Sequence, residues 1–466
     1  MWYKNIRKLP NFNFEKVHLT GRYEANKEKA KKMGIRYKRW GEVARHWLAN
    51  PGINRPYPKY WTEAIKYFRK IKDLHAKKEF EEIAQLQAQG VESVRNKIKK
   101  IFELKPNEYS IIFDSNGSML CSTMAKIFKK KEKLSLTFSD QGRLVYAALV
   151  FESKTIRKFV ANFEQQIGLF EAPPPKQKIN IKRPIPDNLI RIEIFKPDLT
   201  YCSDAEIIDQ YHRAIQDNRI DFVLLLHVSR TGRILPVEDL IKITRDLRPD
   251  LLVFVDGAQA IGRMSYEKIK NIIRMADGYM IVGHKALGAM VSAAFIVKSE
   301  LNSLIKKRLE NTEFYYQKLF KFEGEEENLK ILKKANDEGK PYFFISLPEI
   351  ISLKNALEDN YQNFWEFQKI IAEQKEDITK FLNQEKNIYF NVNRFNAVDD
   401  IISFHLKNPQ KAILLKDYLQ NLNPPITIGP LTENYAIRIG IEPKLPNIKK
   451  TIAYLKETLR NFLKSD

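Results

Sequence analysis

Between Ser110 and Ser299, short apolar runs alternate with helical or turn segments. This alternation constrains the fold class more than any other feature of the sequence. Runs of Val, Ile, Leu and Phe bounded by Asp, Ser or Gly are typical of strands buried on both faces. Helical segments between them, such as PVEDLIKITRDL (236–247), favour an α/β fold with a mostly parallel sheet. The predicted strands are 110–115, 133–139, 157–163, 190–195, 221–229, 251–257, 278–283 and 293–299.

The chain of 466 residues is too long for one compact core, and its two ends differ from the middle. We expect an N-terminal arm over 1–75, a large domain over 76–320 and a smaller α+β domain over 321–466. We predict a short helix at 39–49 in the arm and a long helical stretch over 61–104. A charged helical connector is expected within 301–335, followed by helices at 350–374, 411–422 and 448–464. The predicted strands of the small domain are 387–393, 400–406 and 436–441.

Composition excludes several classes of protein. Two cysteines, Cys121 and Cys202, provide neither a disulfide framework nor a CxxC pair, and the seven histidines show no metal-binding spacing. We therefore expect no metal site. No apolar run approaches the ~18 residues that cross a bilayer, and the start of the chain has no apolar signal-peptide core. These features predict a cytoplasmic protein without a membrane partner.

The net charge of +22 is the main rival signal, because it is typical of proteins that bind nucleic acid. The lysines, however, are spread along the whole chain and mixed with glutamates, as in KKKEK (129–133) and GEEENLKILKK (324–334). No helix-turn-helix, zinc pattern or RNA-binding motif accompanies them. We expect no nucleic-acid partner, although charge alone keeps this alternative open.

An acidic residue and a lysine are candidates for the chemistry of the chain. Asp256 closes an apolar run in VDGAQAIG (255–262), and Lys285 follows 29 positions later in ADGYMIVGHKALGA (276–289). Enzymes that use pyridoxal 5'-phosphate (PLP) need this pair: the lysine holds the cofactor aldehyde as a Schiff base, and the carboxylate keeps the pyridine nitrogen protonated. The alternative is a strand end and an unrelated surface lysine.

Several motifs in matching order show that the chain from about Ala49 onward resembles class V aminotransferases of PLP fold type I. This group includes cysteine desulfurases and isopenicillin N epimerase-like enzymes. The resemblance implies a seven-stranded, mostly parallel sheet in the large domain. It also implies Lys285 as the Schiff-base lysine, Asp256 as the pyridinium partner, and His284 and Gln259 as cofactor contacts.

Further cofactor contacts follow from other segments of the same resemblance. The turn in FDSNGSMLCS (113–122) is expected to bind the cofactor phosphate, because backbone N–H groups and hydroxyls at a helix start suit an anion. Ser229, in HVSRTGRILPVEDL (227–240), is expected beside the cofactor ring, and Lys340 is expected to reach a phosphate site in a second subunit. The predicted phosphate contacts in the turn are Ser115, Asn116, Gly117 and Ser118.

Three residues are candidates for binding the substrate. Arg438, in YAIRIGIEP (435–443), corresponds to the arginine that grips the substrate α-carboxylate, and a planar guanidinium offers two parallel donors for that group. Arg230 stands where relatives carry Asn, and it faces either the substrate or a phosphate or else solvent. Asn50 lies in a segment, 48–65, that resembles the opening turn bordering the substrate pocket.

Several positions depart from the family pattern. Gln141 stands where an aromatic residue or histidine usually stacks on the cofactor ring, Val282 replaces a serine that binds phosphate, and Lys340 replaces a threonine. No cysteine follows Cys202, so the thiolate that accepts sulfur in cysteine desulfurases is missing.

These observations predict a homodimeric PLP enzyme, a transferase or lyase that acts on an amino acid or amine through Lys285 and does not form a persulfide. The alternative is a non-catalytic or regulatory descendant with a degenerate cofactor site.

Overall fold

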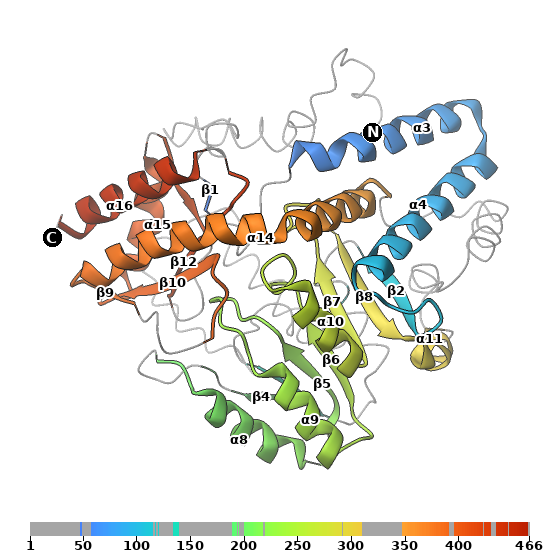
Figure 1. The fold of residues 1–466 in the computed structure, drawn as a ribbon, viewed down its shortest axis with the longest axis horizontal. Helices are drawn as coiled ribbons and strands as arrows, with labels where there is room; N and C mark the ends of the chain where they lie inside the picture. Colours follow the sequence, from blue (N-terminus) through green and yellow to red (C-terminus); the bar gives the residue numbers. More distant parts are fainter. Residues whose placement is uncertain are drawn as a thin grey trace, which may run out of the picture.

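The computed structural model of the chain contains a large sheet and a small sheet, connected by a long helix (Figure 1). No helix among the described residues combines the length and the apolar character that a bilayer span requires. The structure describes residues 47–48, 57–114, 117, 120, 134–138, 189–192, 194, 200–217, 220–290, 292–309, 347–390, 396–422, 424–429, 435–445 and 447–464.

Within the described residues the large sheet has seven strands, in the order β2-β8-β7-β6-β5-β3-β4. Strand β8 is antiparallel to both neighbours, and the pairs from β7 to β4 are parallel. The predicted mostly parallel seven-stranded sheet is confirmed; the expected strand at 157–163 lies outside the described residues. The strands are β2 (Tyr109–Asp114), β3 (Leu134–Phe138), β4 (Leu189–Ile192), β5 (Ile220–Leu226), β6 (Leu252–Asp256), β7 (Gly278–Val282) and β8 (Ala293–Lys298).

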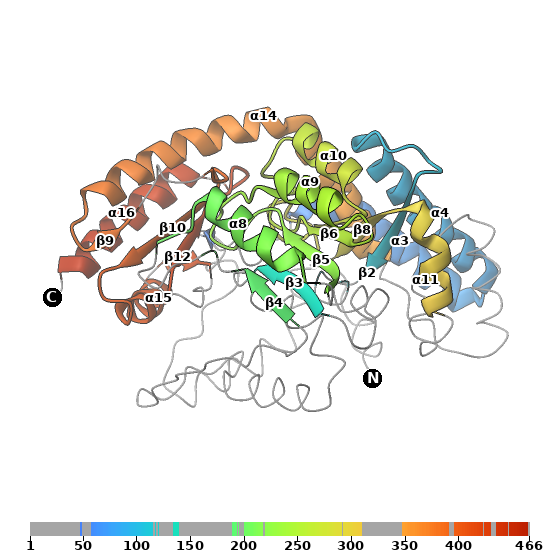
Figure 2. The ribbon, with the colours of Figure 1, turned by 90° about the horizontal axis from the view of Figure 1, so that it is seen from below.

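Three helices lie side by side along one face of this sheet (Figures 1 and 2). Each turns an apolar stripe inward; the second buries Val237, Leu240 and Ile241, for example. The helices are α8 (Asp204–Ile215), α9 (Val237–Leu247) and α10 (Tyr266–Met275).

The N-terminal region corrects two predictions. The helical pattern expected over 61–104 is two helices, α3 (Pro58–Lys77) and α4 (Phe80–Ile101), because Lys78 adopts a left-handed conformation, with φ of 64°, that ends the first. Within the helix expected at 39–49, the described residues Trp47–Leu48 form strand β1 instead. They pair in parallel with β11 (Thr427–Ile428), a distant partner that local helical spacing does not reveal.

The small sheet lies near the C-terminus and is antiparallel, in the order β12-β10-β9. Strand β9 is shorter than the predicted 387–393, whereas the last helix has the predicted bounds. The elements are β9 (Ile388–Tyr389), β10 (Ile401–Leu406), α15 (Lys411–Asn421), β12 (Ile437–Gly440) and α16 (Ile448–Lys464).

Helix α14 (Leu347–Gln384) connects the two sheets and belongs to both apolar cores. Its first half packs Ile350 and Leu353 into the core around the large sheet, and its second half packs Ile378 and Phe381 into the core of the small sheet. Between the large sheet and α14, the described part of the connector is the short helices η5 (Ser299–Leu301) and α11 (Asn302–Leu309). The expected boundaries at residues 75 and 320 stay predictions.

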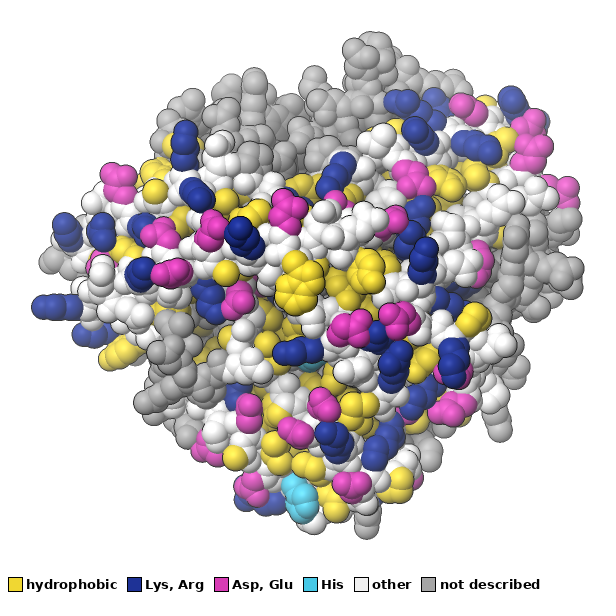
Figure 3. Space-filling view, viewed as in Figure 1, with side chains coloured by type: hydrophobic (Ala, Val, Ile, Leu, Met, Phe, Trp, Pro, Cys, Tyr) yellow, Lys and Arg dark blue, Asp and Glu magenta, His cyan; other side chains and the backbone are white. Residues whose placement is uncertain are grey.

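Charge is mixed on the face seen in Figure 3, where Lys and Arg side chains lie among Asp and Glu side chains of the described residues. Ion pairs among the described residues include Lys354–Glu63, Lys97–Glu358 and Lys456–Asp377. On this face the excess of positive charge does not gather over one element.

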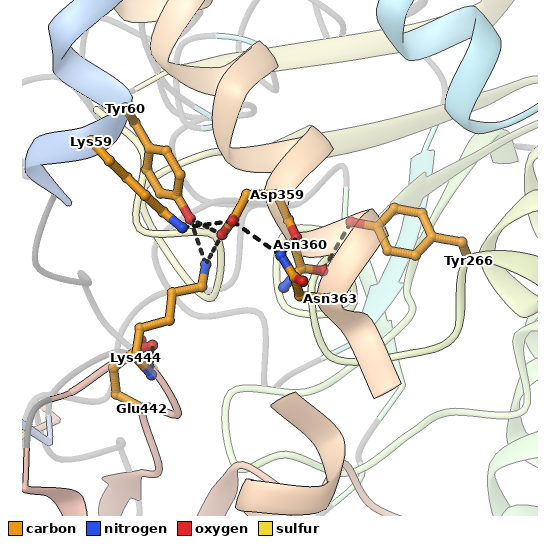
Figure 4. Close-up of polar contacts among 8 residues, drawn as sticks. All are labelled: Lys59, Tyr60, Tyr266, Asp359, Asn360, Asn363, Glu442 and Lys444. Carbon is orange, nitrogen blue, oxygen red and sulfur yellow. Dashed lines mark hydrogen bonds and ion pairs between the residues drawn. The ribbon is translucent and has the colours of Figure 1, made fainter. Parts of the chain in front are cut away.

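A polar cluster fastens the start of α3 to α14 and to the loop after β12 (Figure 4). The Tyr60 hydroxyl donates to Asp359 Oδ2 over 2.5 Å, and Lys444 Nζ donates to the Tyr60 oxygen over 2.8 Å. The rings of Tyr57, Tyr60 and Phe367 surround the Lys444 ammonium at 4.9–5.2 Å. This cluster positions the N-terminal helix against the small-sheet segment that follows Arg438.

Candidate active site

The candidate residues gather where parallel strands of the large sheet end. In register, Asp256 at the end of β6 lies between Leu226 of β5 and Met280 of β7, and Lys285 follows β7 by three residues. Because parallel strands end at the same edge of a sheet, two residues 29 positions apart become neighbours there. The structure thus brings Asp256 and Lys285 together.

The Asp256 carboxyl is buried, with only 1% of the residue exposed. Its Oδ1 accepts a hydrogen bond of 2.9 Å from the Ala258 N–H. Burial raises the pKa of Asp256, while the charge of Lys285 and the Ala258 hydrogen bond act in the opposite direction. A buried carboxylate of this kind favours a cationic neighbour, either Lys285 or a protonated ring nitrogen.

The backbone around Asp256 is fixed from both sides. The His227 N–H donates to the Asp256 carbonyl oxygen over 3.0 Å, and the Gly257 N–H donates to the Met280 carbonyl over the same distance. A hydrogen bond of 2.9 Å joins His227 Nδ1 and the Tyr279 hydroxyl, and burial lowers the pKa of His227 to about 4. His227 and Tyr279 therefore form a neutral, buried pair next to the backbone of Asp256.

Lys285 has the properties of a nucleophile. Burial lowers the pKa of its ammonium group to about 8, against the opposing effect of Asp256, and the positive charges of Arg263, Arg438 and Arg230 lower it further. An amine with this pKa is partly neutral near neutral pH, as attack on an aldehyde requires.

The residues next to Lys285 test whether a cofactor fits. His284 Nδ1 is buried and has no hydrogen-bond partner among the described residues, and burial lowers the pKa of His284 to about 3. A Cβ added to Gly117, the described residue among the four predicted phosphate contacts, would lie 3.0 Å from Val282 Cγ2, so Gly117 lies against the end of β7. These groups fit an aromatic, aldehyde-bearing phosphate ester: the buried carboxylate of Asp256 favours a cation, the Lys285 amine is reactive, and His284 Nδ1 has no partner among the described residues.

The segment after β5 brings two predicted residues together. The Arg438 Nη1 group donates to the Arg230 carbonyl over 3.0 Å, and Arg438 is 2% exposed. The hydroxyl of Ser229 accepts from the N–H groups of Thr231 and Arg233, each over 3.2 Å, so it stabilises its own turn. The positive charges of Arg438 and Arg230 both lower the pKa of Lys285.

Sequence reasoning missed Arg263 and Asp400. Arg263 Nε donates to both carboxylate oxygens of Asp400, over 2.7 and 2.9 Å, and its Nη1 donates to Gln259 Oε1 over 2.8 Å. The spacing of four residues between Gln259 and Arg263 is the one local signal, since such pairs face each other in a helical turn. Nothing in the sequence indicates Asp400, which comes from the small domain.

The structure places eight of the predicted residues near these strand ends or on β12: Asp256, Lys285, His284, Gln259, Ser229, Arg230, Arg438 and Gly117. The remaining predicted residues lie outside the described part of the chain: Ser115, Asn116, Ser118, Gln141, Lys340 and Asn50.

Comparison with known proteins agrees with this arrangement. Residues 191–330 match the model of the class-V aminotransferase family. That segment contains Asp256, Gln259 and Lys285 and confirms the predicted resemblance there. No curated protein sequence matches the chain.

Solved structures share the fold. A NifS-like protein has a TM-score of 0.56 at 15% identity, with 90% of this chain and 100% of that chain covered. The alanine–glyoxylate aminotransferase of Nostoc sp. has a TM-score of 0.56 at 13% identity, covering 92% and 98%. A variant of C-DES with glycine covalently linked to its PLP cofactor has a TM-score of 0.58 at 15% identity, covering 91% and 98%.

The fold is PLP fold type I, as predicted. The family model matches residues 191–330, and the solved structures share the fold at 13–15% identity.

Proposed function

We propose that the chain is a PLP-dependent enzyme that acts on an amino acid or amine through Lys285, with aminotransferase or lyase chemistry. The observation that carries the proposal is the buried Asp256 carboxyl beside a lysine whose pKa is lowered to about 8. The family match over the same residues supports it.

Each residue has a definable task. When bound, PLP supplies a ring that accepts negative charge from the substrate α-carbon. Asp256 stabilises a proton at the ring nitrogen, and burial strengthens this interaction because water does not screen it. Lys285 would hold the cofactor through its aldehyde, and its amine would move a proton at the substrate α-carbon.

Arg438 is the proposed anchor for the substrate carboxylate. Its side chain is buried on β12, and its Nη1 is held by the Arg230 carbonyl, so the guanidinium is fixed in orientation. A fixed fork of donors binds a carboxylate in two places, whereas a lysine binds it as a point charge. Arg438 thus favours α-amino acids over simple amines.

We further propose that the reaction proceeds without a persulfide on the enzyme, because the sequence has only Cys121 and Cys202 and no cysteine after them. We also propose a cytoplasmic homodimer, in which Lys340 of each chain reaches the other chain's phosphate site.

The test is a spectroscopic screen of amino acids against the PLP-loaded protein, with wild type and Arg438→Lys side by side. Productive α-amino acids should shift the visible absorption of the cofactor. We expect the apparent dissociation constant for an α-amino acid to rise at least ~10-fold in Arg438→Lys, as loss of one charge-assisted hydrogen bond implies. The corresponding amine without a carboxylate should bind both proteins equally. Identical affinities in the two proteins would remove Arg438 from this role, and a complete lack of spectral response would favour a degenerate, non-catalytic site.

A further inference from the structure

Lys444 is a buried lysine in the loop that follows β12 of the small sheet (Figure 4). Its side chain is 8% exposed and lies 3.5 Å from Asp359 Oδ2 of α14. Its Nζ also donates to the Tyr60 oxygen of α3 over 2.8 Å. Because both helices contribute apolar residues to the core around the large sheet, this one ammonium group joins the small sheet to the large one.

Both helices also contact the segment that follows Lys285. At the start of α3, the Tyr57 N–H donates to the Gly288 carbonyl over 3.0 Å, and the Gly288 N–H donates to the Lys285 carbonyl over 3.1 Å. In α14, the Ser352 hydroxyl accepts from the Met290 N–H over 3.1 Å. The helices that hold the buried ammonium thus also hold the backbone next to the proposed Schiff-base lysine.

A short, buried stretch of chain connects Lys444 to Arg438. Arg438 lies on β12, and both Arg438 and Glu442 are 2% exposed. The Glu442 side chain accepts from the Lys444 N–H over 3.2 Å through its Oε1. Because packed and hydrogen-bonded backbone deforms little, the position of Lys444 sets the position of Arg438.

The charge of Lys444 gives this connection a defined geometry. Burying an ammonium group costs free energy, and an apolar side chain of the same size is often at least as stable. The ammonium, however, needs its oxygen partners within hydrogen-bonding distance, so few placements of the loop satisfy it. An apolar side chain could shift among the rings of Tyr57, Tyr60 and Phe367, which lie 4.9–5.2 Å from the Lys444 nitrogen, at little cost.

We propose that Lys444 is a positioning residue for the substrate: it fixes Arg438 relative to Lys285 at the separation that an α-amino acid requires. The inference rests on the proposed function, which assigns the substrate carboxylate to Arg438 and the substrate amine to the cofactor at Lys285. An α-amino acid has to reach both groups at once, so their separation decides how well it binds. A simple amine has to reach only the cofactor, so its binding is independent of Lys444.

The test is a spectroscopic titration of PLP-loaded wild type and Lys444→Met. The probes are the standard α-amino acid with the lowest apparent dissociation constant in wild type and the amine that lacks its carboxylate. We expect Lys444→Met to raise the constant of the amino acid by about 10-fold, as for one lost charge-assisted hydrogen bond, and to leave that of the amine unchanged. In an Arg438→Lys background the effect should shrink, because the paired donors that Lys444 positions are then missing.

Lys444→Met should fold, because Asp359 keeps a cationic partner: Lys59 Nζ donates to Asp359 Oδ1 over 2.6 Å. Methionine has a similar length and makes favourable contacts with aromatic rings. Tyr60→Phe is the second variant, because it removes the hydroxyl that joins Lys444 to Asp359 and keeps the ring. It should raise the constant of the amino acid in the same direction, and a wild-type affinity in both variants would overturn the proposal.

Hydrogen–deuterium exchange of the cofactor-free proteins gives a measurement that does not depend on PLP. Lys444→Met should speed exchange in the peptides that contain Tyr57 and Arg438 and leave the peptides of β5 and β6 unchanged, because it loosens a local contact. Equal acceleration in all of these peptides would show a merely structural role and overturn the proposal.

Lys456→Met is the matched control. Lys456 of α16 also pairs with an aspartate of α14, Asp377 at 2.6 Å, but in the half of α14 that packs into the core of the small sheet. It should leave both dissociation constants unchanged, even where it lowers the melting temperature. An equal rise for the amino acid in Lys444→Met and Lys456→Met would contradict the inference alone. A wild-type protein whose cofactor band responds to no amino acid would instead refute the proposed function, and the inference with it.

Discussion

The reactivity of Lys285 before any cofactor binds follows from its surroundings. Burial lowers its pKa from 10.5 to about 8. At pH 7 about one amine in ten is then neutral, against about one in 3,000 for an ordinary lysine, an advantage of roughly 300-fold. Ionised Asp256 opposes this lowering, so Asp256→Asn should move the midpoint below 8.

The assay is trace acetylation of the cofactor-free protein across pH 6 to 11, because acetic anhydride reacts with neutral amines. Mass spectrometry of the Lys285 peptide, normalised to a lysine peptide in the same tube, gives the titration of this one amine. We expect a midpoint near 8 in the wild-type protein and a lower one in Asp256→Asn. A wild-type midpoint near 10.5, or an upward shift in Asp256→Asn, would refute the electrostatic reasoning.

Two further variants test the packing around the site by thermal or denaturant unfolding. Gly257→Ala would place a Cβ 2.2 Å from the buried ring of Tyr279, so we expect a loss of about 1–3 kcal/mol in unfolding free energy, and a neutral result would contradict the packing described. Asp359→Asn removes the negative charge that pairs with buried Lys444, whose pKa is already lowered by burial. We expect a loss of about 3 kcal/mol in unfolding free energy. Asp209→Asn, in an exposed ion pair, is its control and should change stability by less than about 1 kcal/mol; an equal loss in both would contradict the role of the cluster.

Much of the fold was predictable because buried parallel strands leave a strong local pattern. The continuous apolar runs 221–229 and 251–257 overlap β5 and β6. The helical spacing of apolar residues over 448–464 predicted the bounds of α16. The break at Lys78 was not predictable, since its left-handed conformation has no glycine to mark it. Strand β1 was missed because its pairing with β11 joins distant parts of the chain.

The residues of the candidate site were likewise predictable only in part. Asp256 and Lys285 were found because strand ends and a motif mark them in sequence. Asp400 was not, because its importance comes from a contact with Arg263 across 137 positions. Ser229 shows the limit of a motif: its hydroxyl is a hydrogen-bond acceptor in its own turn, which sequence does not reveal.

The most direct test of the account is the visible spectrum of the purified protein incubated with PLP, before and after borohydride, with Lys285→Ala alongside. Reduction should fix the cofactor covalently, and peptide mapping should locate it on Lys285, while the variant stays unlabelled and folded. A protein that remains colourless with excess PLP, or that carries the label on other lysines alone, would contradict the central claim.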